Sequence, residues 1–156
     1  MKSLLPALAL FTGLTCALPA CAQFQKSEDA IKYRQGAFRV MAEHFGRIGA
    51  MANGRVPFDA KVAQENMALV DALHGLPFSA FDAGSDKGAP NRARPEVWKD
   101  AAKFKAARDK LDGEMSKLAA AVKGGDLGAI KTAFGATGGA CKGCHDDFRA
   151  KDYSAN

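Results

Sequence analysis

Apolar residues recur with a helical period over most of this chain. In one stretch, Ile31, Phe38 and Phe45 stand seven residues apart, which places them on one side of a helix. Alanine is abundant, β-branched residues are sparse and no alternating strand pattern stands out. The pattern therefore predicts an all-α protein with four amphipathic helices. We expect these helices at residues 27–51, 58–75, 95–123 and 126–151.

Capping residues mark the expected ends of these helices. Ser27, Asp59 and Asp126 stand where a side-chain oxygen can accept from the first turn. Pro95 suits the start of the third helix, and Gly124-Gly125 suits its end.

Three glycines weaken the fourth helix, each by about 1 kcal/mol relative to alanine. They are Gly135, Gly138 and Gly139. We interpret them as points where the backbone approaches a cofactor or a neighbouring helix. A break into two shorter helices is the alternative.

Residues 77–94 form one long connection between the second and third helices. Gly84, Gly88 and Pro90 rule out regular structure through most of it, apart from a short helical turn near residues 78–81. A loop of this length in a small domain is often functional. Because the other connections are short, the sequence predicts an antiparallel four-helix bundle with one long loop.

Residues 1–22 have the features of a secretory signal peptide. Lys2 precedes an apolar stretch at residues 4–18, and Ala20-Cys21-Ala22 has the small residues that signal peptidase prefers. The apolar stretch is too short to span a bilayer comfortably. We predict export to the periplasm, no membrane span, and cleavage after Ala22. A lipoprotein signal acylated at Cys21 is the alternative.

Cleavage would leave residues 23–156, a length that suits one domain. The full chain has a formal net charge of +5, with its basic residues spread along its length. No stripe of basic and aromatic residues indicates binding to nucleic acid. A mild positive field suits attraction of an acidic redox partner, and it serves solubility equally well.

Cys141-Lys142-Gly143-Cys144-His145 is the candidate chemistry of the chain. C-x-x-C-H is typical of covalent haem c attachment, in which each thiol forms a thioether and the histidine binds the iron. On a helix, residues three and four apart share a face. The sequence thus predicts one haem c per chain, attached through Cys141 and Cys144, with His145 as axial ligand.

Other uses of these cysteines remain open. Cys16 and Cys21 would leave with the signal peptide, and a close pair can also form a disulfide or a redox dithiol. The adjacent histidine favours haem. A zinc site needs two further ligands, and the other histidines, His44 and His74, are distant in the sequence.

The opposite side of the iron must be supplied from upstream, because no methionine follows the motif. Phe38 lies on the apolar side of the first helix and cannot bind iron, whereas Met41 on the same side could. His44 points off that face and is interpreted as a surface residue. A second ligand makes a low-spin electron-transfer centre, while an empty apolar side leaves the iron open to small gases.

These residues resemble a cytochrome c′, the class of bacterial four-helix haem proteins with a C-terminal C-x-x-C-H, and in particular its denitrifier type. The resemblance covers the whole chain after residue 22. Its blocks are Gln23-Phe24, Lys32-Tyr33-Arg34-Gln35, His44-Phe45-Gly46-Arg47, Arg94-Pro95-Glu96-Val97-Trp98, Gly125-Asp126-Leu127, Ala133-Phe134-Gly135 and residues 141–149.

The resemblance implies further roles around the haem. Arg34 and Gln35 match a pair that contacts the haem propionates, although a surface salt bridge is the alternative for Arg34. Phe38 matches the hydrophobic distal residue. Arg149 matches a basic residue beside the proximal imidazole, with an exposed pair to Asp146 as the alternative.

The long loop departs from the family pattern by a few extra residues. Arg92 is the loop residue that we expect near the haem edge.

The resemblance also implies a function. It implies a high-spin, pentacoordinate haem that binds NO and CO and discriminates against O2, in a periplasmic homodimer packed through its first two helices. NO binding or detoxification and electron transfer are the implied roles. The alternative is a low-spin electron carrier of the cytochrome c-556 type with Met41 as sixth ligand. No acid–base pair is placed near the iron, so we do not expect an enzyme.

Overall fold

The computed structural model describes residues 23–154. The predicted signal peptide, its cleavage point after Ala22, and Cys16 and Cys21 lie outside the described residues.

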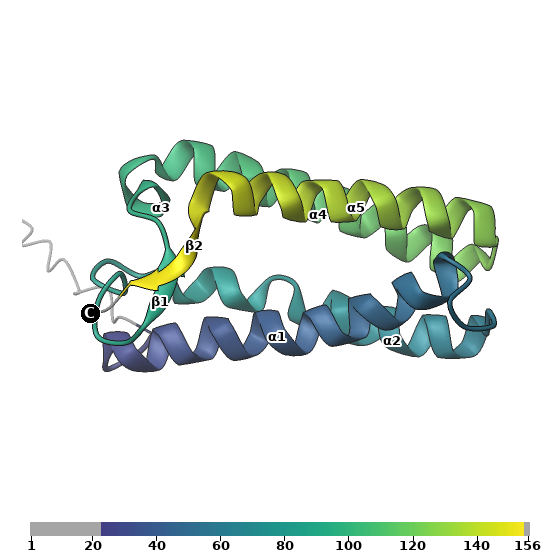
Figure 1. The fold of residues 1–156 in the computed structure, drawn as a ribbon, viewed down its shortest axis with the longest axis horizontal. Coiled ribbons are helices and arrows are strands. Elements are labelled where there is room, and N and C mark those ends of the chain that lie inside the picture. Colours follow the sequence, from purple (N-terminus) through teal and green to yellow (C-terminus); the bar gives the residue numbers. More distant parts are fainter. Residues whose placement is uncertain (1–22, 155–156) are drawn as a thin grey trace, which may run out of the picture.

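Four long helices form the body of the protein. They are α1 (Ser27–Ala52), α2 (Ala60–Leu73), α4 (Ala101–Gly124) and α5 (Leu127–Phe148). Helix α1 packs against α2, and α4 packs against α5, so the two pairs form two layers of an antiparallel bundle (Figure 1). The predicted all-α four-helix bundle is confirmed.

The core fills the bundle with the apolar faces that the helical period predicted. Ile48, Val70 and Leu118 come from three different helices and are fully buried. Beside them, the rings of Phe45 and Phe134 stack with their centroids 4.3 Å apart. Gly49 allows this contact, because a Cβ atom there would lie 2.3 Å from Cζ of Phe134.

Helix α5 is continuous through Gly135, Gly138 and Gly139, so the predicted alternative of a break into two shorter helices is wrong. A Cβ atom at any of the three would meet nothing within 4 Å, so no neighbouring helix approaches there. Gly138 instead lines the cavity that is described below.

Aspartates cap three of the helices. The carboxylates of Asp59, Asp100 and Asp126 accept from the backbone N–H groups of Val62, Lys103 and Ala129, respectively. The predictions for Asp59 and Asp126 are thus confirmed. Ser27 is the first helical residue rather than a cap, since α1 begins after Lys26 with no side-chain cap.

The third predicted helix is two helices. A short α3 (Glu96–Lys99) stops at Asp100, whose backbone leaves the helical region at φ −124° and ψ 64°. The same residue caps α4 through a bond of 3.0 Å from the Lys103 N–H. A capping side chain inside a helical pattern competes with continuation of the helix, which explains the break.

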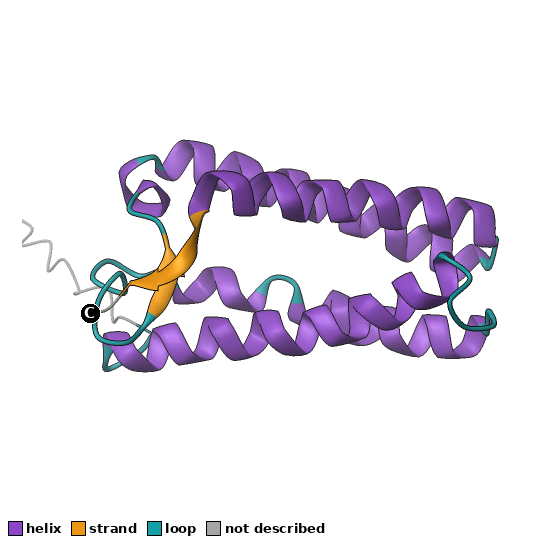
Figure 2. Cartoon of the chain, in the orientation of Figure 1, coloured by secondary structure: helices purple, strands orange, loops and turns teal. Residues whose placement is uncertain are grey.

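A small strand pair was missed at the sequence level. The long loop contains a 3-10 helix, η1 (Leu76–Ala80), and strand β1 (Asn91–Ala93), which pairs antiparallel with β2 (Arg149–Ser154) (Figure 2). The last helix therefore ends at Phe148, earlier than predicted. The Arg94 N–H donates to the Phe148 carbonyl at 2.9 Å, and this tertiary contact stops the helix.

Within residues 23–154, none of the helices has the length and apolar character needed to cross a bilayer.

Candidate haem-binding site

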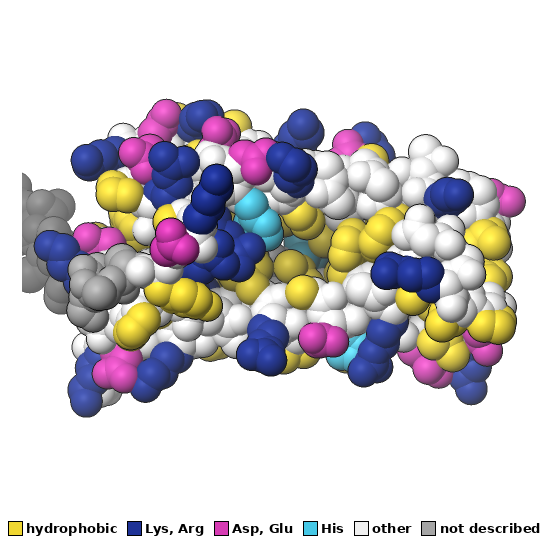
Figure 3. Space-filling view, viewed as in Figure 1, with side chains coloured by type: hydrophobic (Ala, Val, Ile, Leu, Met, Phe, Trp, Pro, Cys, Tyr) yellow, Lys and Arg dark blue, Asp and Glu magenta, His cyan; other side chains and the backbone are white. Residues whose placement is uncertain are grey.

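A large cavity opens between the two layers of the bundle. Its volume is about 1090 Å³, and it is lined by residues from α1, η1, α4 and α5 together with both strands. Pockets for drug-sized ligands span about 300–1,000 Å³, so this cavity suits a large group. The face in Figure 3 is hollowed, and basic side chains gather at the end where β1 and β2 lie.

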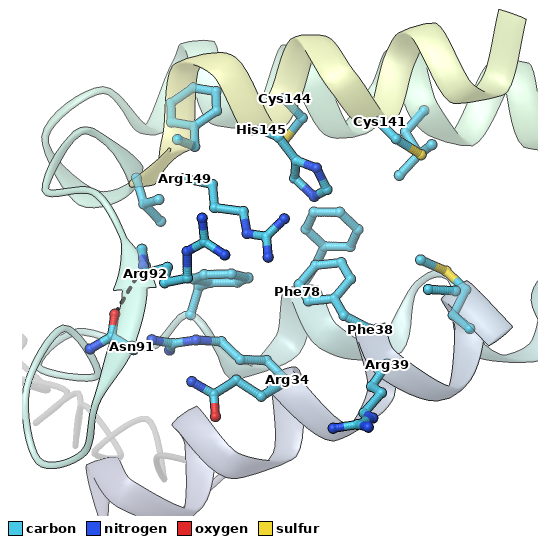
Figure 4. A pocket seen from close by; sticks show the side chains of 18 of the residues that line it. Arg34, Phe38, Arg39, Phe78, Asn91, Arg92, Cys141, Cys144, His145 and Arg149 are labelled. Atoms are coloured by element: carbon cyan, nitrogen blue, oxygen red, sulfur yellow. Dashed lines mark hydrogen bonds between the residues drawn. The ribbon is translucent and has the colours of Figure 1, made fainter. Parts of the chain in front are cut away.

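Cys141, Cys144 and His145 all line this cavity from α5. Figure 4 shows the three on the wall that faces α1. Their predicted common helix face therefore turns toward the cavity. Both cysteines are free, so the structure does not contain the alternative disulfide. Burial raises the pKa of the Cys141 and Cys144 thiols, which keeps them protonated at neutral pH.

The environment of His145 favours its neutral imidazole. Removal from water lowers the pKa of His145, and the charges of Arg149 and then Arg92 lower it further, against a smaller opposing effect of Asp146. A neutral imidazole has the lone pair that a metal requires. Within residues 23–154, no three His, Cys, Asp or Glu side chains converge as a zinc site requires.

The wall opposite His145 is apolar and rich in aromatic rings. Phe38 lines it from α1, and its ring meets that of Phe78 edge-on at 5.9 Å. Phe78 also packs against Phe104 of α4 at 5.9 Å. Met41 lies on the same wall and is 8% exposed. Sequence reasoning missed Phe78, although the predicted turn near residues 78–81 was a signal that it could face inward.

Arg34 lines the cavity and bonds to the long loop. It is 3% exposed, and its Nη1 donates to the Ala80 carbonyl at 2.8 Å and to Ser85 Oγ at 2.9 Å. Its Nη2 donates to the Ser85 carbonyl at 2.7 Å. Both terminal nitrogens thus bond to the loop, and Cζ of Arg34 lies 4.5 Å from the centre of the Phe81 ring. The burial of Arg34 excludes the surface salt bridge that was its alternative, and the implied propionate contact stays a prediction.

The remaining basic and polar candidates stand at the strand end of the cavity. Gln35 lines it, while its Nε2 donates to the Pro90 carbonyl at 3.0 Å. Arg92 and Arg149 line it as well. The alternative pair between Arg149 and Asp146 is absent, and the Asp146 carboxylate forms an ion pair with Lys142.

The other histidines stay away from the cavity. His44 Nδ1 lies 2.9 Å from Asn66 Oδ1 on α2, so it is half-buried between helices rather than on the open surface. His74 packs near Asp71 and Asp112. Neither lines the cavity with His145.

Known proteins share this architecture. A family model described as cytochrome c′ matches residues 29–149. The chain belongs to the cytochrome c′ family.

Individual members are close to the chain in sequence and fold. It is 60% identical over 129 residues to cytochrome c′ of Rubrivivax gelatinosus, covering 83% of this chain and all of that protein. The crystal structure of cytochrome c′ from that organism at pH 8.0 superimposes with a TM-score of 0.80 at 61% identity, covering 81% of this chain and 99% of that one.

A more distant member was solved with a ligand. A leucine-to-alanine variant of cytochrome c′ from Alcaligenes xylosoxidans, in complex with nitric oxide, has a TM-score of 0.79 at 43% identity. That comparison covers 83% of this chain and 100% of the other.

The cytochrome c′ family implies a covalently bound c-type haem, and the residues of this cavity fit one. Two free thiols and a neutral imidazole lie on one helix face, which is the donor set that haem c attachment uses. The facing wall is apolar and the cavity is large.

Proposed function

We propose that this protein is an exported c-type haem protein that binds NO and CO at its iron, with electron transfer as a second use of the same centre. The observation that carries the proposal is the wall opposite His145, where Phe38 and Phe78 offer no donor atom to a metal. An iron held on one side only by imidazole is open to a small ligand.

Complexes of relatives support the choice of ligands. Solved structures of Alcaligenes xylosoxidans cytochrome c′ variants include nitric oxide complexes and a carbon monoxide complex. The protein in the carbon monoxide complex has 43% sequence identity to this chain, and its structure superimposes with a TM-score of 0.78. We extend binding of both gases to the present protein.

Each wall of the cavity contributes differently. Cys141 and Cys144 would hold the haem by two thioethers, and His145 would bind the iron. The haem, when bound, supplies an iron that takes one diatomic ligand. Phe38 and Phe78 make the wall opposite His145 apolar, which would favour a small neutral ligand over an anion. Arg149 lies beside His145 and can donate a hydrogen bond on that side.

We propose binding rather than turnover. Acid–base catalysis needs a proton donor and acceptor near the reacting atoms. Among the described residues, the cavity lining includes a single carboxylate, Glu43 of α1. One carboxylate without a partner supports a gas-binding or electron-transfer protein.

A low-spin electron carrier is the second candidate, because Met41 lines the cavity on the same wall as Phe38. A thioether sulfur can occupy the sixth position of a haem iron. Substitution Met41→Leu separates the two functions. It should abolish a low-spin spectrum if Met41 binds the iron, and it should leave a high-spin spectrum unchanged otherwise.

The test of the function is the visible absorption spectrum of the purified haem protein, ferric and ferrous, with and without NO. We expect a broad high-spin Soret band that shifts when NO is added. Sharp, split α and β bands in the ferrous protein, with no response to NO, would reject the open iron.

We also propose a homodimer packed through α1 and α2. The outer surfaces of these helices carry exposed apolar side chains, namely Val40, Val62 and Leu69, of which Leu69 is 46% exposed. Exposed apolar patches mark association surfaces. Sedimentation should give a dimer, and Leu69→Lys should shift it to a monomer. The exposed Leu127→Lys on α5 serves as the control.

Export is proposed from residues 1–22. The intact mass of the protein recovered from the periplasm tests it. A chain that begins at Gln23 supports cleavage after Ala22, whereas an acylated Cys21 would mean lipoprotein processing.

A further inference from the structure

Two arginines from different segments meet at the strand end of the cavity. Arg92 lies on β1 and Arg149 opens β2, and the pairing of Ala93 with Arg149 brings the two strands together. Figure 4 shows both side chains running into the same part of the cavity, between α5 and α1. Both arginines line the same cavity as His145.

The position of Arg92 is fixed by contacts within the strand pair. Its Nε donates to the Ala150 carbonyl at 2.8 Å, and its Cζ lies 5.7 Å from the centre of the Tyr153 ring. Neither contact is a hydrogen bond of the two terminal nitrogens of Arg92, and the residue lines the cavity. A guanidinium group held in place before binding loses less side-chain entropy when it binds.

Neither guanidinium has a carboxylate partner within residues 23–154. Other arginines nearby do, since Arg94 lies 3.6 Å from Glu96 and Arg108 lies 3.6 Å from Asp112. The one acidic residue in the cavity lining, Glu43, belongs to α1 and is in no ion pair with either arginine. Two like charges that share a cavity repel each other, and an anion bound between them offsets this repulsion.

We propose that Arg92 and Arg149 form an oxyanion-binding site at the strand end of the haem cavity, beside His145. Planar guanidinium groups bind carboxylate, nitrite or phosphate oxygens through paired, charge-assisted hydrogen bonds. The inference rests on the proposed function for the presence of haem. The oxyanion has two sources, a carboxylate of the haem itself or a free inorganic oxyanion, and one set of measurements distinguishes them.

The experiment compares the haem-loaded wild type with Arg92→Gln and Arg149→Gln. Arg94→Gln is the matched control, because it removes the same charge from a neighbouring residue that does not line the cavity. Thermal unfolding is followed as phosphate or nitrite replaces chloride at constant ionic strength. The haem reduction potential is measured over a range of pH in the same samples.

Each source gives its own result. A free oxyanion raises the unfolding temperature of the wild type with concentration, and each cavity variant weakens its apparent affinity about tenfold or more. A haem carboxylate gives no dependence on added phosphate or nitrite, but each cavity variant changes the pH dependence of the potential. Arg92→Lys keeps the charge and loses the paired donors, so it should give an intermediate effect even if a glutamine variant folds poorly.

Cavity variants that match Arg94→Gln in both measurements would overturn the site. The NO-induced shift of the Soret band is recorded in the same samples. A wild type that responds to NO while the arginine variants have no effect would reject the site alone. If the wild type gives no NO response but the arginine variants still change the unfolding temperature or the potential, gas binding is rejected and the oxyanion site is kept.

Discussion

Replacing Arg34 by methionine should destabilise the fold by releasing the long loop. The guanidinium group binds the Ala80 and Ser85 carbonyls and Ser85 Oγ. Methionine keeps most of the length and removes all three hydrogen bonds. The loop that bears η1 and β1 then loses three of its hydrogen bonds to α1.

The size of the stability loss follows from the carbonyl groups that lose their hydrogen-bond donor. The Ala80 carbonyl keeps a contact of 3.3 Å with Ser85 Oγ, which also donates to the Asp82 carbonyl at 2.8 Å. The Ser85 carbonyl loses its donor, at a cost of about 1–3 kcal/mol. Loss of the contact with the Phe81 ring costs about 1 kcal/mol more. Burial disfavours the charge and lowers the pKa of Arg34 to about 10, so methionine recovers part of this loss. We expect a net loss of about 2 kcal/mol.

Urea unfolding followed by circular dichroism measures this loss, and a destabilisation of that size should lower the thermal midpoint by about 8 °C. Hydrogen exchange should locate the increase at residues 80–86. Arg39→Met is the control, because this exposed arginine of α1 makes none of these bonds and should change stability by less than about 0.5 kcal/mol. Equal midpoints for Arg34→Met and Arg39→Met would refute the loop-anchoring role.

Three further changes test other parts of the structure. Phe38→Ala should speed CO association about tenfold, equivalent to about 1.4 kcal/mol of barrier, and an unchanged rate in flash photolysis would remove Phe38 from the distal wall. Gly49→Val should cost about 1–3 kcal/mol in urea unfolding, because its Cβ would lie 2.3 Å from Cζ of Phe134. Phe134→Leu should relieve most of that cost, and an additive double variant would contradict the clash. His145→Ala should lose the axial ligand, and added imidazole should restore the visible spectrum unless another group binds the iron.

The helices and the haem motif could be predicted because their signals are local. The apolar residues of each helix recur about every 3.6 positions. Asp59 and Asp126 accept hydrogen bonds from the first turns of the helices that they cap. Cys141, Cys144 and His145 share a face through spacing alone. Each of these signals lies within a few neighbouring residues of the chain.

The features that were missed depend on contacts between distant segments. Strand β1 is three residues long, too short for an alternating pattern, and it exists because it pairs with β2. The sequence likewise showed that Arg34 lies on an apolar face, but only the folded loop shows that Ala80 and Ser85 are its partners. Arg92 and Arg149 come together for the same reason.

The pairing of β1 with β2 also bears on the order in which the protein assembles. Strand β2 follows every helix in the sequence, so it is synthesised after them, and its partner β1 lies before α3. Contacts between such distant segments form late in folding, because the intervening chain must first be ordered. The bundle can therefore assemble while the strand end of the cavity is still open, which leaves a route for a large planar group to enter before the tail closes behind it.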